Sequence, residues 1–124
     1  MTHKLKIMVV DDNPANLKLA GDLLEMEGFE VCRCTDAEST LDALKRFYPN
    51  LILMDIAMPG IDGLQLTKKL KSGESTKDIK IVALTASAMK GDKERILSHG
   101  CDGYITKPID TRKFREQIMP YLQS

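Results

Sequence analysis

The chain has 124 residues, of which 43% are hydrophobic and 29% charged, a composition that predicts a single globular domain over residues 1–124 and excludes a disordered chain. Its 18 basic residues balance its 18 acidic ones, so it has no net charge with which to attract nucleic acid or an anionic membrane. No apolar run approaches the roughly 18 residues of a transmembrane helix, and the N-terminus has no signal-peptide pattern.

Short apolar runs alternate with segments of helical spacing five times along the chain. The first run stops at Asp11. Asn13 can cap the helix that follows, and Pro14 is typical of the first helical position. Gly28 is typical of a helix end, and Pro49 ends the second helix. The predicted strands are 7–10, 29–34, 51–54, 81–84 and 103–106, and the predicted helices are 14–27, 36–48, 63–71, 92–99 and 111–122.

The predicted strands are apolar on consecutive residues rather than on alternate ones. Strands of this kind are buried on both faces, as in a parallel sheet that is covered by helices. With right-handed crossovers, five strand–helix units build a doubly wound α/β sandwich of three layers around a five-stranded parallel sheet. This is the fold class that the sequence predicts.

Polar residues follow four of the five predicted strands. Asp11 and Asp12 follow the first strand, Asp55 the third, Thr85 the fourth and Lys107 the fifth. In an open α/β sheet, ligands bind in the crevice beyond the carboxyl ends of the strands. We therefore expect these five side chains to share one site.

Three carboxylates in one crevice repel one another and require a cation. Oxygen ligands without histidine are typical of Mg²⁺, with Mn²⁺ as an alternative. A lysine and a threonine hydroxyl suit the oxygens of a transferred phosphoryl group, which a carboxylate can accept. Asp55 stands alone at its strand end, whereas Asp11 and Asp12 form a pair, so Asp55 is the better nucleophile.

Each of these residues also has a purely structural interpretation. The run Asp11–Asn13 can simply cap a helix, and Asp55 can simply stabilise a turn before Pro59–Gly60. Thr85 can be a simple strand terminus and Lys107 a solvated loop lysine. The convergence of four strand ends on one edge favours the functional interpretation over these separate ones.

Four segments resemble the receiver domains of two-component response regulators. They are 9–13 (VVDDN), 53–63 (LMDIAMPGIDG), 83–86 (ALTA) and 103–108 (GYITKP), and the resemblance extends over essentially the whole chain. It is strongest for single-domain receivers of the chemotaxis or cell-cycle phosphorelay kind and for receivers of hybrid histidine kinases. The resemblance implies a flavodoxin-like fold and a signalling switch, whose only expected catalysis is its own phosphorylation and dephosphorylation.

The resemblance also implies a set of Mg²⁺ ligands. Asp12 would bind the ion directly and Asp11 through water, and Asp55 would be both ligand and phosphoacceptor. The backbone carbonyl of Ala57 would complete the protein's share of the ligands.

The switch itself is implied to lie at the fourth and fifth strands. Thr85 and Lys107 would contact the phosphoryl oxygens, and Thr85 would move toward them while Tyr104 swings inward. This movement would alter the surface formed by the fourth helix, the fifth strand and the fifth helix.

The resemblance also implies that the Lys107–Pro108 peptide bond is cis. Small residues, Ala57 and Ser87, stand where many family members carry larger polar ones, so no phosphoryl lifetime is predicted.

The implied partners are a histidine kinase or a histidine phosphotransfer protein as donor, and a downstream protein as target. We expect a monomer without direct nucleic acid or membrane binding. A cytoplasmic location is expected because the three cysteines lack zinc-site and thioredoxin-like spacing and are expected to be reduced. The donor would dock on a surface beside the site. The alternative interpretation of this region is ordinary exposed helix surface. Its residues would be Ala15, Asn16, Leu19, Pro108 and Ile109.

Two other functions are consistent with the fold. A Mg²⁺-dependent phosphohydrolase with a nucleophilic aspartate needs a second acid two residues later, where this chain has Ala57. An interaction module that is never phosphorylated would be expected to have lost Asp12, Asp55 or Lys107, and all are present. The residues therefore favour the phosphorylation switch.

Overall fold

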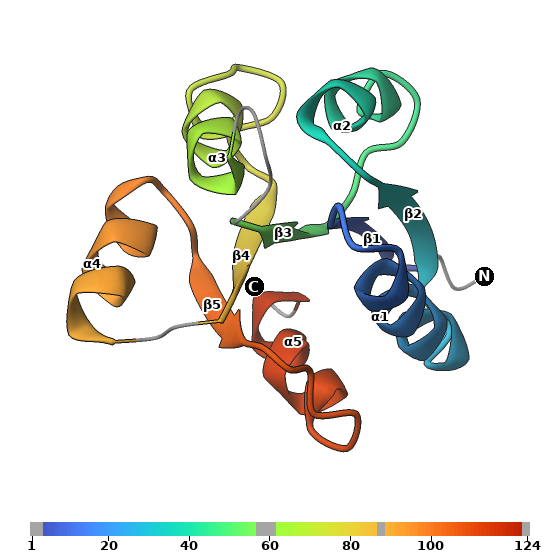
Figure 1. The fold of residues 1–124 in the computed structure, drawn as a ribbon. Helices are drawn as coiled ribbons and strands as arrows, with labels where there is room; N and C mark the ends of the chain where they lie inside the picture. The colour runs from blue at the N-terminus through green and yellow to red at the C-terminus, as the bar shows by residue number, and fades with distance from the viewer. Residues whose placement is uncertain (1–3, 57–61, 87–88, 123–124) are drawn as a thin grey trace.

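Five parallel strands form one sheet at the centre of the structure, a computed structural model that describes residues 4–56, 62–86 and 89–122 (Figure 1). The strand order is β2-β1-β3-β4-β5, and all four neighbouring pairs are parallel. The predicted fold class is confirmed. The strands are β1 (Lys6–Val10), β2 (Glu30–Cys34), β3 (Leu51–Asp55), β4 (Lys80–Thr85) and β5 (Gly103–Thr106), and the helices are α1 (Pro14–Met26), α2 (Ala37–Ala43), α3 (Gly63–Lys71), α4 (Lys90–Ser98) and α5 (Phe114–Leu122).

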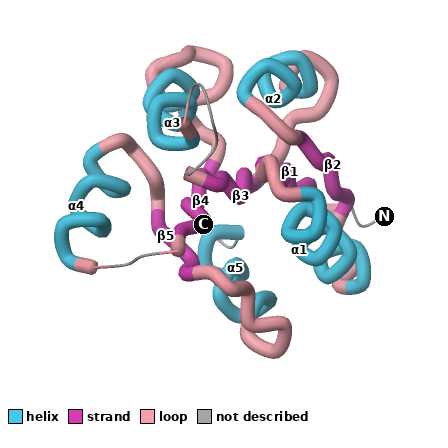
Figure 2. The backbone as a smooth tube through the Cα atoms, in the orientation of Figure 1, coloured by secondary structure: helices cyan, strands magenta, loops and turns pink. Residues whose placement is uncertain are grey.

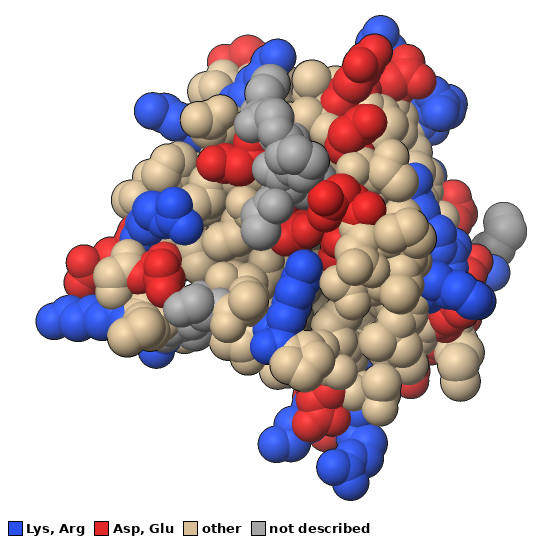
Figure 3. Space-filling model, in the orientation of Figure 1, with Lys and Arg blue, Asp and Glu red and all other residues tan. Residues whose placement is uncertain are grey.

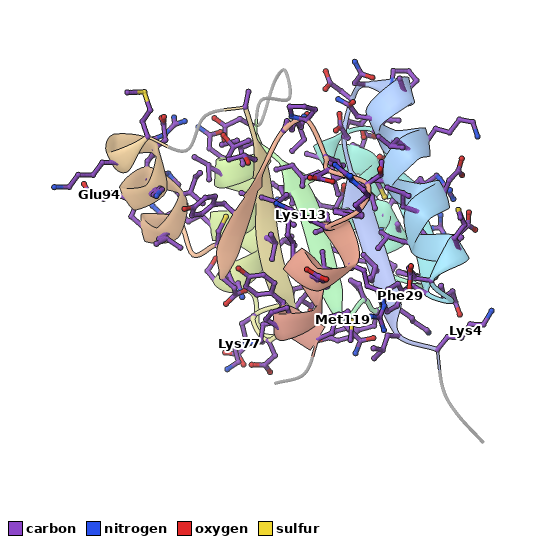
Figure 4. The ribbon with its side chains drawn as sticks, turned by 90° about the horizontal axis from the view of Figure 1, so that it is seen from below. Lys4, Phe29, Lys77, Glu94, Lys113 and Met119 are labelled. Atoms are coloured by element: carbon purple, nitrogen blue, oxygen red, sulfur yellow. The ribbon has the colours of Figure 1, made fainter. Side chains whose placement is uncertain are left out.

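Helices cover both faces of the sheet (Figure 2). Residues of α2, α3 and α4, among them Leu66 and Ile96, pack against one face. Residues of α1 and α5, among them Leu24 and Phe114, pack against the other. Figure 4 shows α1 and α5 on the near side of the strands. The two covered faces explain why consecutive strand residues are buried: in β1, Met8 belongs to the first core cluster and Val9 to the second.

The ends of α1 follow the local chemistry of the sequence. The amide of Asn16 donates to Asn13 Oδ1 at 3.1 Å, so Asn13 caps the helix, and Pro14 occupies its first position. Past the C-terminal end, Gly28 has a φ of +92°, a conformation that costs glycine little.

Two helices, α2 and α5, are shorter than predicted by several residues. α2 ends at Ala43 rather than at residue 48, because the amides of Lys45 and Arg46 donate three residues back, to Asp42 and Ala43, and so tighten the chain into turns. α5 begins at Phe114 rather than at residue 111. There the side chain of Asp110 accepts from the amide of Arg112 at 3.0 Å, and this bond holds the preceding residues in a turn.

None of the helices in the described part of the chain combines the length and the apolar character needed to cross a membrane.

Candidate functional site

Three carboxylates meet at the carboxyl edge of the sheet. Asp11 and Asp12 directly follow β1, and Asp55 is the last residue of β3, the neighbouring strand. One carboxylate oxygen from each lies within 4.8 Å of the others. Asp11 and Asp55 are buried, with 1% and 3% exposure, whereas Asp12 is exposed. Figure 3 shows acidic side chains gathered at the centre of this face, with a basic side chain beside them.

Backbone hydrogen bonds fix the residues that carry the site. The amide of Asp11 donates to the carbonyl of Cys34 at 3.0 Å, which extends the pairing of β1 with β2 past the last strand residue. The Asp11 carboxylate in turn accepts from the amide of Asn13 at 2.9 Å. Beyond β5, the amide of Lys107 donates to the carbonyl of Thr85 at 2.7 Å. The side chains at the strand ends are therefore attached to ordered backbone.

The ammonium group of Lys107 lies between two of the carboxylates. Its Nζ is 3.2 Å from Asp55 Oδ1 and 3.4 Å from Asp11 Oδ2. The lysine side chain is 21% exposed, so the ion pairs are partly shielded from water. The sequence predicted that Lys107 would reach this edge, and the structure brings it together with both buried acids.

The site still has an excess of negative charge. Burial raises the pKa of Asp11, and the nearby charge of Asp55 raises it further, while the amide of Asn13 and the charge of Lys107 oppose the rise. Within the described residues, Asp11 Oδ2 is buried without a hydrogen bond, because its contact with Lys107 does not meet hydrogen-bond geometry. Three carboxylates, one of them with an unsatisfied buried oxygen, fit a hard divalent cation such as Mg²⁺.

Thr85 and Tyr104 lie on neighbouring strands next to the carboxylates. Thr85 ends β4 and is buried at 5% exposure. Tyr104 pairs in register with Ala83, two residues before Thr85, so the two side chains share one face of the sheet. The Nζ of Lys93, from α4, lies 5.6 Å from the centre of the Tyr104 ring. This contact between a helix and a strand was missed by the sequence analysis, since no local spacing signals it.

A hollow of about 330 Å³ opens beside the site, between α1 and the chain that follows β5. Four of the five residues predicted for donor docking line it, and Ala15, which is exposed on α1, does not. The Lys107–Pro108 peptide bond at its rim is cis. The lining residues are Asn16, Leu19, Ala86, Lys107, Pro108 and Ile109. Ala86 and the second role of Lys107 are not predicted from the sequence.

One glycine also belongs to the site. A Cβ atom on Gly63, the first residue of α3, would collide with the carbonyl oxygen of Asp55 and lie 2.8 Å from the Cα of Ile56. From the sequence alone, Gly63 is expected only at the start of a helix. Two further predicted positions, Ala57 and Ser87, lie outside the described residues.

The family model for the response regulator receiver domain matches residues 7–119. The polar-differentiation response regulator DivK of Brucella ovis is 47% identical over 116 residues, 94% of each chain. The receiver domain of sensor histidine kinase PA1611 from Pseudomonas aeruginosa, solved with a magnesium ion coordinated in its active site cleft, is 29% identical, has a TM-score of 0.87 and matches 98% of this chain and 100% of its own. A CheY-like receiver domain protein from Methanospirillum hungatei is 31% identical, with a TM-score of 0.86 over 97% of this chain and 94% of its own. The sheet, the carboxylate edge and these relatives agree: the chain belongs to the family of response regulator receiver domains.

Proposed function

We propose that residues 1–124 act as one receiver domain, a switch that is turned on when Asp55 accepts a phosphoryl group from a phosphohistidine. The donor is a histidine kinase or a histidine phosphotransfer protein. The observation that carries this proposal is the position of Lys107, whose ammonium group contacts the buried carboxylates of Asp55 and Asp11 at once. A lysine held there can neutralise phosphoryl oxygens on Asp55 without leaving its place.

The transfer is a substitution at phosphorus. A carboxylate oxygen of Asp55 forms a bond to the phosphorus atom while the bond from phosphorus to the histidine nitrogen breaks, and the electron pair of that bond stays with the histidine. Lys107 and the hydroxyl of Thr85 bind the oxygens of the phosphoryl group. The unphosphorylated histidine is the leaving group, and Asp55 becomes an acyl phosphate.

The three carboxylates are proposed to hold a Mg²⁺ ion, Asp12 and Asp55 directly and Asp11 through water, with Mn²⁺ as a substitute. The buried, unsatisfied oxygen of Asp11 supports this assignment. When bound, the ion offsets the negative charge that gathers on the phosphoryl oxygens during transfer. The chain's own contribution is to hold its acids within 4.8 Å of one another on fixed strand ends.

The signal is proposed to leave the site through Thr85 and Tyr104. A shift of Thr85 toward the phosphoryl group would open space on the face of the sheet that Tyr104 shares, and the tyrosine ring would move into it. The surface of α4, β5 and α5 would then change its affinity for a downstream protein. We propose that the chain works as a monomer in the cytoplasm, catalyses only its own phosphorylation and dephosphorylation, and contacts neither nucleic acid nor membrane. Its three free cysteines are in keeping with that compartment.

Intact mass measurement tests the proposal directly. The protein is incubated with acetyl phosphate and Mg²⁺, with samples without metal and with Asp55→Asn alongside. Asp62→Asn is a matched control, because Asp62 is another aspartate near the site whose side chain accepts from the amide of Gln65, a cap that asparagine retains. The expected result is one phosphoryl adduct that requires Mg²⁺, persists in Asp62→Asn and is lost in Asp55→Asn.

A missing adduct is resolved by measuring phosphate release from the same sample. Phosphate release that requires Mg²⁺ and Asp55 would support the proposal, with a short-lived acyl phosphate. Absence of both the adduct and the release would contradict it and favour a module that works without phosphorylation.

A further inference from the structure

The buried sulfur atoms gather on one face of the sheet. The core cluster beneath α2, α3 and α4 contains five sulfur-bearing residues, whereas the described members of the cluster beneath α1 and α5 contain none. The five are Met8, Cys32, Cys34, Met54 and Cys101. These residues are closest together at one place in the strand order.

That place is the edge strand β2. Cys32 and Cys34 are two residues apart on it, so their side chains point to the same face, and both belong to the same core cluster. Met8 of β1 pairs in register with Cys32 and belongs to the same cluster, on a backbone about 4.8 Å away. Two thiols and one thioether therefore share one face at the edge of the sheet.

The two thiols differ in their exposure. Cys34 is buried at 3% exposure, and its Sγ lies 3.9 Å from the carbonyl oxygen of Ser39. Burial raises the pKa of Cys34 to about 12, and the neighbouring thiol of Cys32 adds to the rise. Cys32 is only half-buried, and β2 is an edge strand of the sheet that the described residues form. A ligand can therefore reach the pair through Cys32.

Geometry decides against a disulfide between them. Same-face neighbours on a strand have Cβ atoms roughly 6.6 Å apart, at about 3.3 Å per residue. A disulfide requires Cβ atoms about 3.5–4.5 Å apart, so the strand would have to deform. The neutral thiol of Cys34 is a weak nucleophile toward an oxidant, and it becomes a metal ligand only by losing its proton to the incoming ion. A bound metal ion would require a smaller deformation of the strand than a disulfide. Two sulfur atoms that are each about 2.3 Å from a common ion can lie up to about 4.6 Å from each other.

We propose that Cys32 and Cys34, with Met8 as a third ligand, form a binding site for a soft monovalent cation, Cu(I). A ligand set of two thiolates and one thioether favours this soft ion over harder divalent cations. Binding replaces two thiol protons by one Cu(I), with both protons released to solvent and no change in oxidation state. The site is separate from the carboxylates that hold the phosphoryl group and does not depend on the proposed function.

Competition with the chromophoric Cu(I) chelator bicinchoninate, under anaerobic conditions, measures the affinity and the stoichiometry. The variants are Cys32→Ala, Cys34→Ala, Met8→Leu and the matched control Cys101→Ala, which removes a buried free thiol of the same cluster. Far-ultraviolet circular dichroism verifies that each variant is folded. If Cys34→Ala fails to fold, the half-buried Cys32 still provides a variant that removes one ligand.

We expect one Cu(I) per chain and a loss of more than roughly 100-fold in affinity in Cys32→Ala and Cys34→Ala, since even outer-sphere partners contribute 10–100-fold. Met8→Leu is expected to lose roughly ten-fold or more. Cys101→Ala is expected to bind as the unmodified chain does. Equal losses in Cys32→Ala and Cys101→Ala, no loss in Cys32→Ala, or no transfer of Cu(I) from the chelator to the unmodified chain would overturn the proposal.

Discussion

Gly63 lies against the backbone of Asp55 so closely that no side chain fits between them. An added Cβ atom would collide with the carbonyl oxygen of Asp55 and lie 2.9 Å from its carbonyl carbon. The contact joins the first residue of α3 to the last residue of β3, the strand that carries the proposed phosphoacceptor. Since the neighbour is backbone rather than the end of a flexible side chain, it can yield only if the strand end moves.

Gly63→Ala should therefore displace Asp55. We expect the free energy of unfolding to fall by about 1–3 kcal/mol, the usual cost of forcing an extra methyl group into packed structure. Phosphorylation by acetyl phosphate should slow as well, because the Asp55 carboxylate would lose its alignment with Lys107. Urea unfolding and the rate of adduct formation measure the two effects.

Gly91→Ala is the matched control for this substitution. Gly91 lies in α4, and an added Cβ would have no atom within 4 Å. Alanine should be neutral there or stabilise by up to about 1 kcal/mol through helix propensity. Equal stability and equal phosphorylation rates in both variants would show that Gly63 does not position the site.

The sequence predicted the strands well because their signal is local. Consecutive apolar residues such as Leu51–Met54 indicate burial on both faces, and in parallel strands the residues that follow share one edge, which is how Asp11, Asp55 and Lys107 could be grouped. The contact of Gly63 with Asp55 was not predictable in this way. It depends on how closely α3 approaches β3, which residue spacing does not specify.

Helix ends were predicted less well than strands. Asn13 was recognised because its side chain caps the helix that follows directly. The early end of α2 and the late start of α5 depend on backbone bonds of three-residue spacing and on the side chain of Asp110, which compete with helical bonds. Such competition is decided by small energy differences that apolar periodicity does not reveal.

Lys107→Met should destabilise the chain most strongly when Mg²⁺ is absent. The buried carboxylates of Asp11 and Asp55 would lose the ammonium group that contacts both, and we expect the free energy of unfolding to fall by about 1–3 kcal/mol. The deficit should shrink at saturating Mg²⁺, which would supply the missing positive charge. Urea unfolding with and without Mg²⁺ measures it.

Lys71→Met provides the comparison. Lys71 is similarly shielded, at 20% exposure, and its Nζ lies 2.8 Å from Asp102 Oδ2. This ion pair is separate from the three-carboxylate site. Its loss should destabilise the chain by an amount that Mg²⁺ does not change. A Mg²⁺-independent deficit in Lys107→Met would argue against a cation site at Asp11 and Asp55.

Asp11→Asn should stabilise the metal-free chain at neutral pH. Burial raises the pKa of Asp11 in the folded state above its value of 3.8 in the unfolded chain, so the folded state holds the proton more tightly. The stability that this provides is present at low pH and is lost as the pH rises through the raised pKa. The advantage of Asp11→Asn over the unmodified chain should therefore grow with pH.

Urea unfolding in a chelating buffer, at pH values between about 4 and 7, measures this difference. Adding Mg²⁺ should reverse the order, because the unmodified chain gains binding energy that the asparagine variant lacks. An advantage that is constant with pH, or one that Mg²⁺ does not remove, would contradict the assignment of Asp11 to the cation site.

Leu19→Asp should separate phosphorylation by a protein donor from phosphorylation by a small molecule. Leu19 lines the hollow beside Lys107 and is 39% exposed, so a charge there would meet an apolar partner surface. Transfer from a phosphorylated histidine protein should slow by roughly ten-fold or more, the effect of losing a contact worth about 1.4 kcal/mol or more. The rate with acetyl phosphate should not change.

Met26→Asp is the control. Met26 is on the same helix but is 82% exposed and lies outside the hollow, so this variant should leave both rates unaltered. Equal slowing in the two variants, or slowing with acetyl phosphate, would show that the hollow is not where the donor docks.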